Sequence, residues 1–253
     1  TLKKSFNKLK SDRLNNDKKY IILKKLGKNK KDLFKKMLAI GKVSNLVAQN
    51  SKKNLIVEVK PNVNSIKKIG NKKNVKKILR YHQTNLGGSI HTDGPQLNTP
   101  PKYILMACVN NSKRGGLSII LDSKKIYDKI KKNHKLKNSL SQKFYFERRG
   151  FNGKKTLLKK IFTVSKNTFI FRYLRDYIDS AYAILKKDLN PKELRLLNVI
   201  DNLMRDKKLH IRYKLMKGDV IILNNYRLAH GRTDFAINKK NSQRNLLRMW
   251  LQK

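Results

Sequence analysis

The chain has 253 residues, of which 39% are hydrophobic and 31% are charged, so it is long enough for one substantial core. Lys and Arg outnumber Asp and Glu by 62 to 16, which gives a formal net charge of +46. No run of about 18 apolar residues is present, and this argues against a transmembrane helix. The single cysteine, Cys108, lies in an apolar run and fits a buried thiol in a reducing cytoplasm, where we expect the protein.

The positive charge has two interpretations. One is a coat of solvated lysines that reflects an AT-rich genome, because Lys, Asn and Ile are all abundant and lysines occur in every segment. The other is a polyanion partner, since a charge of this size binds phosphate backbones non-specifically at low salt. We favour the first, because no zinc-finger spacing, RNP-like aromatic motif or helix-turn-helix signature predicts specific nucleic-acid recognition.

The first third of the chain is predicted to contain helices, one strand and a basic loop. Residues 1–20 are rich in lysine and are expected to be frayed or to form a surface helix. The sequence begins at a threonine, which leaves open that it is trimmed or partial. Residues 31–50 carry apolar side chains at near-helical spacing, which predicts an amphipathic helix. A strand is predicted at 55–59, and the basic stretch 62–78 is expected to be a loop with a short helix.

Strands dominate the rest of the chain. Apolar runs and alternation predict strands at 103–110, 117–122, 143–149, 156–164, 168–173, 209–216, 219–224 and 244–251. Helices are predicted at 123–133, 181–185 and 191–204. Strands, then a helical insertion, then more strands are typical of an antiparallel barrel or jelly roll with helices outside. We therefore expect one domain over residues 1–253, mainly β with flanking helices, in which 123–208 contains a lid-like insertion.

The most informative motif is His91-Thr92-Asp93, together with His230 far down the chain. In a short strand, residues two apart point to the same side, so His91 and Asp93 would face one point. Two imidazoles and one carboxylate on one face of a metal leave other positions open, which is the ligand pattern of non-haem Fe(II) oxygenases. A His-x-Asp tripeptide alone is a weak signal, because such residues also form hydrogen bonds in turns, so the rest of the chain decides.

Four segments resemble the TauD/TfdA family of Fe(II)- and 2-oxoglutarate-dependent dioxygenases, in particular its clavaminate-synthase-like and γ-butyrobetaine-hydroxylase-like branch. They come in family order and lie at residues 82–94, 115–122, 218–233 and 244–250. The combination is more specific than any one of them. The resemblance implies the double-stranded β-helix, also called the jelly roll.

The resemblance also implies roles for single residues. The catalytic iron ligands would be His91, Asp93 and His230. Ser118 and Arg244 would bind the distal carboxylate of 2-oxoglutarate; 24 residues separate Ser118 from Asp93, and 13 separate Arg244 from His230. Ser118 replaces the commoner Thr, and Asn224 stands where Asp is more usual, which affects a supporting hydrogen bond and not the metal ligands.

Three further residues are candidate substrate contacts. Asn85 precedes the metal motif, and Arg248 matches a position that often meets substrate or supports the cofactor pocket. Arg172 lies on an otherwise apolar strand, where it could reach an anionic substrate or pair with a core carboxylate.

The sequence therefore predicts a dioxygenase that uses Fe(II), 2-oxoglutarate and O2 to hydroxylate or otherwise oxidise a small carboxylate- or amine-bearing molecule, with release of succinate and CO2. The alternative is a basic nucleic-acid-binding protein on a β-barrel scaffold without catalysis. The enzyme predicts Fe(II) binding that is lost in His91→Ala or Asp93→Ala, whereas the alternative predicts salt-sensitive polyanion binding that neither change affects. The sequence predicts neither the substrate nor the oligomeric state.

Overall fold

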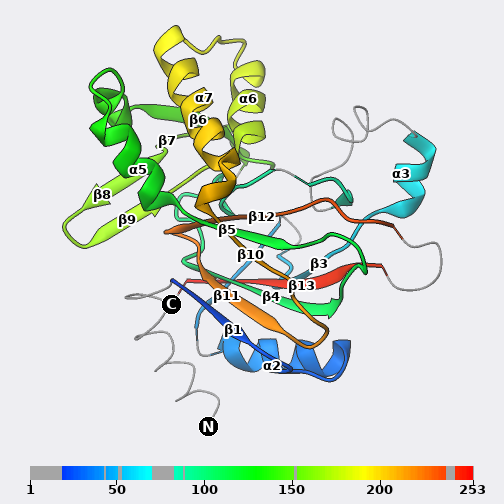
Figure 1. Cartoon of the computed structure of the whole chain (residues 1–253). Helices are drawn as coiled ribbons and strands as arrows, with labels where there is room; N and C mark the ends of the chain where they lie inside the picture. The colour runs from blue at the N-terminus through cyan, green and yellow to red at the C-terminus, as the bar shows by residue number, and fades with distance from the viewer. Residues whose placement is uncertain are drawn as a thin grey trace.

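Two antiparallel sheets form the centre of the computed structural model, which describes residues 19–42, 44–50, 53–69, 83–87, 89–150, 153–237 and 243–252 (Figure 1). The larger sheet has the order β1-β11-β4-β13-β2, with β3 also paired to β13. Its strands are β1 (Tyr20–Leu23), β2 (Leu46–Val47), β3 (Ile56–Val59), β4 (Tyr103–Asn110), β11 (Val220–Asn224) and β13 (Asn245–Leu251). The smaller sheet, in the order β10-β5-β12, consists of β5 (Ser118–Asp122), β10 (His210–Tyr213) and β12 (Leu228–Arg232).

Alternation along β4 shows how the layers pack. Ile104 and Cys108 belong to one buried cluster with Ile120 of the smaller sheet, so this cluster lies between the sheets. Tyr103 and Ala107, on the opposite face of the strand, pack in a second cluster with the apolar side of α2 (Lys30–Lys42). Side chains of successive strand residues point to opposite faces, so one apolar run fills both layers. Figure 1 shows α2 along the outer face of the larger sheet.

The long insertion between β5 and β10 covers the outer face of the smaller sheet. It contains α5 (Ser123–Lys132), η3 (Lys137–Ser141), β6 (Lys143–Glu147), β7 (Thr156–Lys160), β8 (Phe162–Ser165), β9 (Thr168–Phe171), α6 (Arg175–Ile184), α7 (Pro191–Arg205) and η5 (Lys207–Leu209). Its buried residues form a third cluster with Ile119, Leu121 and Ala229 of the smaller sheet. Figure 1 shows these elements gathered on the side of the molecule away from α2. A short helix, α3 (Val63–Ile69), follows β3.

The predicted mainly β class with flanking helices is confirmed, and most predicted strands match to within a few residues. Three strands were not predicted, namely β1, β2 and β12. The predicted helix at 31–50 is wrong beyond residue 42, because Asn45 adopts a left-handed backbone with φ 46° and the chain then enters β2. Apart from its last residues, the segment 1–20 lies outside the described residues.

Two predicted boundaries in the insertion also differ. The single strand at 156–164 is in fact two strands, β7 and β8, which belong to different hairpins, β6-β7 and β8-β9. The helix predicted at 181–185 begins at Arg175. Charged and polar residues dominate its first six positions, where only Tyr177 and the buried Ile178 are apolar, and the Arg175–Asp179 ion pair supports it. Among the described residues, no helix is both long and apolar enough to cross a membrane.

Candidate metal centre

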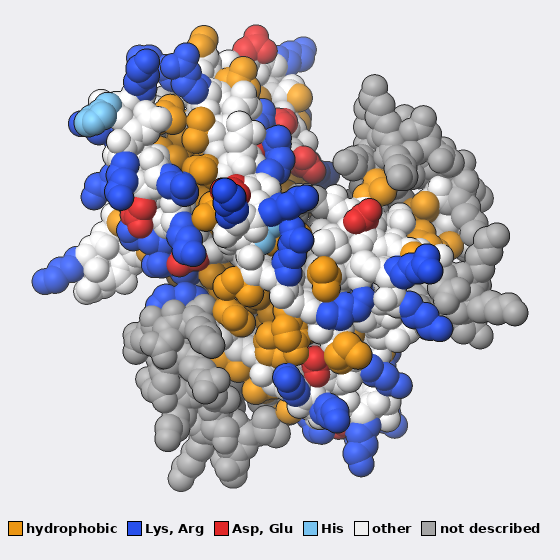
Figure 2. Space-filling view, in the orientation of Figure 1, with side chains coloured by type: hydrophobic (Ala, Val, Ile, Leu, Met, Phe, Trp, Pro, Cys, Tyr) orange, Lys and Arg blue, Asp and Glu red, His pale blue; other side chains and the backbone are white. Residues whose placement is uncertain are grey.

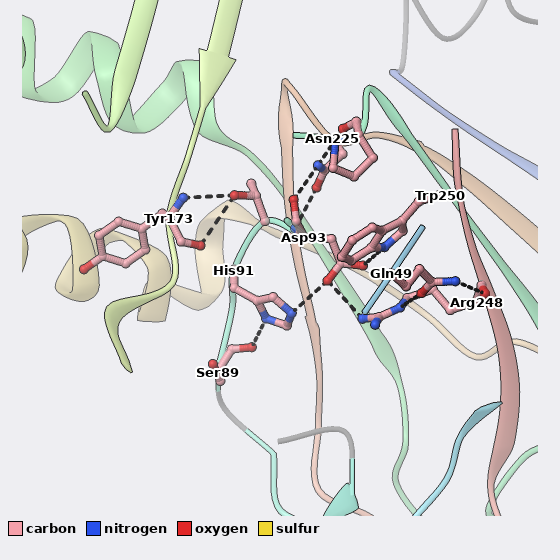
Figure 3. Close-up of polar contacts among 10 residues, drawn as sticks. Gln49, Ser89, His91, Asp93, Tyr173, Asn225, Arg248 and Trp250 are labelled. Carbon is pink, nitrogen blue, oxygen red and sulfur yellow. Dashed lines mark hydrogen bonds and ion pairs between the residues drawn. The ribbon is translucent and has the colours of Figure 1, made fainter. Parts of the chain in front are cut away.

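His91 and His230 lie directly opposite each other across a short antiparallel bridge. The backbone N–H of His91 donates to the carbonyl of His230 at 2.9 Å, and the reverse bond measures 2.8 Å. Their ring centroids are 4.8 Å apart. Asp93 follows two residues after His91, and one ligand atom from each of the three residues lies within 4.8 Å of the others. The structure therefore brings together the three side chains predicted to bind iron, and Figure 3 shows His91 and Asp93 pointing toward each other.

The protonation of the two histidines suits a metal ligand. Nδ1 of His91 lies 3.0 Å from the carbonyl of Ser89, so this nitrogen donates the proton and Nε2 keeps a lone pair on the side of Asp93, 3.5 Å from Oδ1. Burial lowers the pKa of His230 to about 3, although the Asp93 carboxylate opposes that shift. His230 is therefore neutral at neutral pH, which is the form that binds metals.

The buried Nδ1 of His230 has no hydrogen-bond partner among the described residues. A buried polar atom of this kind is uncommon and calls for an explanation such as a bound ion. With two imidazoles beside an ionised carboxylate, the three side chains offer two nitrogen ligands and one oxygen ligand to a divalent cation. The residues present therefore fit a non-haem Fe(II) site.

Asp93 is held at both carboxylate oxygens. Trp250 Nε1 donates to Oδ2 at 2.8 Å, and Arg248 Nη1 donates to Oδ1 at 3.0 Å. Arg248 and Trp250 stand two apart on β13 and so point to the same face. Burial alone would raise the pKa of Asp93, but the positive charge of Arg248, together with the contact from His91, outweighs it and holds this pKa well below its usual range. The carboxylate is therefore ionised and oriented.

Gln49 supports Arg248 from behind. Its Oε1 accepts a 2.8 Å bond from Arg248 Nε, and its Nε2 donates to the carbonyls of Leu55 and Arg248 (Figure 3). The amide of Gln49 thus ties the loop after β2 to β13, and fixes the guanidinium that contacts Asp93.

The backbone of the metal motif is anchored on two sides. Asn225 accepts from the N–H of Asp93 at 2.9 Å and donates to the carbonyls of Asp93 and Pro101. Thr92 and Tyr173 exchange two 2.9 Å bonds, one between their backbones and one from the Tyr173 N–H to Thr92 Oγ1. The first anchor comes from the end of β11, and the second comes from the insertion (Figure 3).

The two predicted cofactor residues lie at the β5 side of the barrel interior. In the β12–β5 register, His230 faces Ile120 and Arg232 faces Ser118. Directly paired residues point to the same face, so Ser118 shares the inner face with His230. Arg244, 4% exposed, passes so close to Gly116 that a Cβ there would lie 3.2 Å from its Cδ. Arg244 thus reaches the loop that leads into Ser118.

The three predicted substrate residues make contacts within the protein. Arg248 contacts Asp93, as described. Asn85 Nδ2 donates to the carbonyl of Phe235 at 3.2 Å. Arg172 is buried, and its guanidinium donates to the carbonyls of Pro95, Leu97 and Asn98, not to a core carboxylate. Burial lowers the pKa of Arg172 to about 10. The substrate roles of these residues stay predictions.

The functional roles of Gln49, Asn225 and Trp250 were not predicted from the sequence. For Trp250 a signal existed, because it lies two residues after Arg248 on a predicted strand and so shares its face. Gln49 had no such signal, since it lies 199 positions from Arg248 in the sequence.

Comparison with known proteins agrees with this geometry. Gamma-butyrobetaine dioxygenases of Homo sapiens and Pongo abelii are each 29% identical to the chain over 154 residues, which is 58% of this chain and 40% of theirs. The chain thus spans about 40% of the length of these curated relatives.

Solved structures share the fold at low identity. Asparagine oxygenase in complex with Fe(II), 2S,3S-3-hydroxyasparagine and succinate superposes with a TM-score of 0.72 at 12% identity, over 99% of this chain and 79% of that one. The non-heme iron oxygenase OrfP in complex with Fe and alpha-ketoglutaric acid gives 0.64 at 13% identity, over 99% and 79%. A taurine dioxygenase from Burkholderia xenovorans gives 0.62 at 14% identity, over 92% and 76%. The predicted double-stranded β-helix is thereby confirmed.

The family model described as taurine catabolism dioxygenase TauD, TfdA family matches residues 11–250, which is nearly the whole chain. The order of the four segments that resemble the family, the fold and the His91, Asp93 and His230 set all agree with that match. The chain belongs to the TauD/TfdA family.

Proposed function

We propose that this protein is an Fe(II)- and 2-oxoglutarate-dependent dioxygenase that oxidises a small molecule. The observation that carries the proposal is the convergence of one ligand atom each from His91, Asp93 and His230 within 4.8 Å, with Asp93 ionised and His230 neutral. Family membership supports it, as do neighbours whose structures contain Fe with succinate or alpha-ketoglutaric acid.

When bound, Fe(II) would supply the chemistry by which O2 and 2-oxoglutarate yield succinate and CO2, with one oxygen atom entering succinate and the other used to oxidise the substrate. The protein supplies orientation and excludes side reactions. His91, Asp93 and His230 would hold the metal on one face and leave the other positions open. Trp250 and Arg248 would keep the carboxylate of Asp93 turned toward it.

Ser118 and Arg244 would bind the distal carboxylate of 2-oxoglutarate. The inward position of Ser118 and the burial of Arg244 beside Gly116 support this role. A guanidinium is always charged and presents a planar fork that matches a carboxylate. The relatives suggest small substrates that carry a carboxylate, a sulfonate or a quaternary amine, and we propose a substrate of this size.

The large positive charge does not require a nucleic-acid partner. Figure 2 shows Lys and Arg side chains spread over the visible face, with Asp and Glu side chains among them. On this face, the distribution fits a solvated coat better than one basic groove. The proposed enzyme is therefore favoured over the nucleic-acid-binding alternative.

The experiment that tests the proposal is an anaerobic titration with Fe(II) and 2-oxoglutarate, which follows their visible charge-transfer band. We expect the band in the wild type, a weaker band in Arg244→Ala, and no change in Arg212→Ala, which removes an exposed arginine of β10. We expect His91→Ala and Asp93→Ala to lose stoichiometric Fe(II) binding, whereas His210→Ala keeps it. Folded wild-type protein that binds iron but shows no band would contradict the proposal.

A further inference from the structure

Two buried arginines converge on Asn98, five residues beyond the metal ligand Asp93. Arg148 follows β6 and is 4% exposed, and its Nη1 donates to Asn98 Oδ1 at 3.3 Å. Arg172 follows β9 and is 6% exposed, and its Nη2 donates to the carbonyl of Asn98 at 3.1 Å. Two positively charged side chains therefore contact Asn98, which is neutral. Arg148 contacts its side chain, and Arg172 contacts its backbone carbonyl.

Neither charge is compensated within the part of the chain that the structure describes. The acid next to Arg148, Glu147, forms its ion pair with Arg149 at 3.1 Å instead. Arg172 contacts only backbone carbonyls. Arg148 makes one hydrogen bond out of the five that a guanidinium can donate, and its buried Nε has no described partner. Burying a cation without an anion is unfavourable, so this arrangement calls for a negatively charged partner.

We propose that Arg148 and Arg172 form an oxyanion-binding site beside Asn98 that takes a carboxylate or sulfonate group of the substrate. Arg148 provides the unused donors of its planar fork, which suits a bidentate contact. Arg172 provides charge, since carbonyls already occupy its terminal nitrogens. The substrate assignment rests on the proposed dioxygenase function.

The position of this site relative to the metal ligands fits a substrate contact. Five residues of fully extended chain span at most about 18 Å, which bounds the distance from Asp93 to Asn98. The turn in which the N–H of Leu97 donates to the carbonyl of Gly94 makes this distance shorter. Asn98 itself is exposed, so an anion can approach from solvent. Arg148 belongs to the insertion and Asn98 to the loop after the metal motif, so an anion bound here would connect the two.

The test is thermal unfolding during a titration with sodium sulfate at constant ionic strength, with 2-oxoglutarate present to occupy the site at Arg244. We compare the wild type, Arg148→Met, and Lys166→Met, which removes the same charge from an exposed turn. We expect sulfate to raise the melting temperature of the wild type and Lys166→Met by a few degrees in a saturable way. Arg148→Met should lose this saturable response and melt higher than the wild type without sulfate.

An equal sulfate response in all three proteins would overturn the proposal, because it would show a general effect of charge. If Arg148→Met does not fold, Arg148→Lys takes its place, since it keeps the charge and removes the fork. We then expect half-saturation at a sulfate concentration at least about tenfold higher than in the wild type, and unchanged half-saturation would overturn the proposal.

A second experiment distinguishes a carboxylate or sulfonate group of the substrate from a free inorganic anion as the occupant of this site. Small acids and their primary amides are compared as stimulants of succinate release. We expect only acids to act, and Arg148→Lys to raise KM for an active acid at least about tenfold while kcat changes much less. Equal activity of acid and amide would overturn the substrate assignment. The Fe(II) and 2-oxoglutarate band, recorded on the same samples, separates this result from a failure of the proposed function, which would abolish the band in the wild type.

Discussion

The indole Nε1 of Trp250 donates a hydrogen bond of 2.8 Å to Oδ2 of Asp93, across 157 residues of sequence. Because Arg248 holds the other oxygen, the carboxylate has one orientation before any metal is bound. Partners of this kind orient a metal ligand and raise metal affinity without contacting the metal. Trp250 is therefore a positioning residue of the proposed site.

Trp250→Phe is expected to weaken Fe(II) binding by about 10- to 100-fold, because it removes the donor to Asp93 and keeps most of the apolar packing. The measurement is an anaerobic Fe(II) titration of the wild type and the variant. Tyr213→Phe serves as control, since it alters a half-buried aromatic of the same inner cluster outside the metal set. Equal affinity in Trp250→Phe and the wild type would show that Arg248 alone orients the carboxylate.

Thr92 connects the metal motif to the insertion through its side chain. In Thr92→Val the N–H of Tyr173 loses its acceptor, and leaving a buried donor unpaired costs about 1–3 kcal/mol of unfolding free energy. Because Thr92 lies between two ligands, we also expect weaker Fe(II) binding. Urea unfolding and Fe(II) titration measure the two effects. Thr92→Ser keeps the hydroxyl and should retain both properties; a loss of equal size in Thr92→Ser would contradict this account.

Much of the site could be predicted because its signals are local. The spacing of His91 and Asp93 puts both on one side of a short strand, and apolar alternation places most strands of the two sheets. The strand that carries His230 was not predicted, since Leu228–Arg232 contains no β-branched residue and one glycine. Its extended form depends on pairing with β5.

The contacts that tune the site could not be read from the sequence, because they join distant segments. Gln49 was placed in a predicted helix, yet it lies beyond β2 and binds Arg248. Arg172 was expected to pair with a core carboxylate or to reach a substrate; its guanidinium donates to three backbone carbonyls, contacts that the sequence does not predict, and its substrate role stays a prediction. No periodicity in the chain specifies which polar groups meet at such a distance.

His230 predicts a dependence of stability on pH in the metal-free protein. Burial lowers its pKa to about 3, from 6.5 in a model peptide. Between these values the unfolded chain binds a proton that the folded protein does not, so the unfolding free energy falls as the pH decreases. The contribution is at most about 1.4 kcal/mol per pH unit, and it ends below about pH 3.

Urea unfolding from about pH 4 to about pH 8, in the presence of a chelator, measures this dependence. We expect His230→Gln to show a smaller loss of stability toward acid pH than the wild type, because the buried side chain no longer titrates. His134→Gln alters an exposed histidine and should follow the wild-type curve. Parallel curves for His230→Gln and the wild type would mean that His230 does not contribute to the slope.

Gly116 is expected to be necessary for 2-oxoglutarate binding. Its φ of +68° favours glycine, and a Cβ there would lie 2.9 Å from Oδ1 of Asn111, and 3.2 Å from Cδ and 3.3 Å from Nε of Arg244. Gly153 has a similar φ of +65° with nothing within 4 Å of a Cβ, so Gly153→Ala is a matched control for backbone strain. Both variants should lose about 1–2 kcal/mol of unfolding free energy. Only Gly116→Ala should also displace Arg244, and so weaken 2-oxoglutarate binding by roughly tenfold at unchanged Fe(II) affinity, a loss of about 1.4 kcal/mol.

The charge-transfer titration measures the affinities of both variants for Fe(II) and for 2-oxoglutarate. If Gly116→Ala bound 2-oxoglutarate as tightly as Gly153→Ala, the assignment of Arg244 to the co-substrate carboxylate would be wrong.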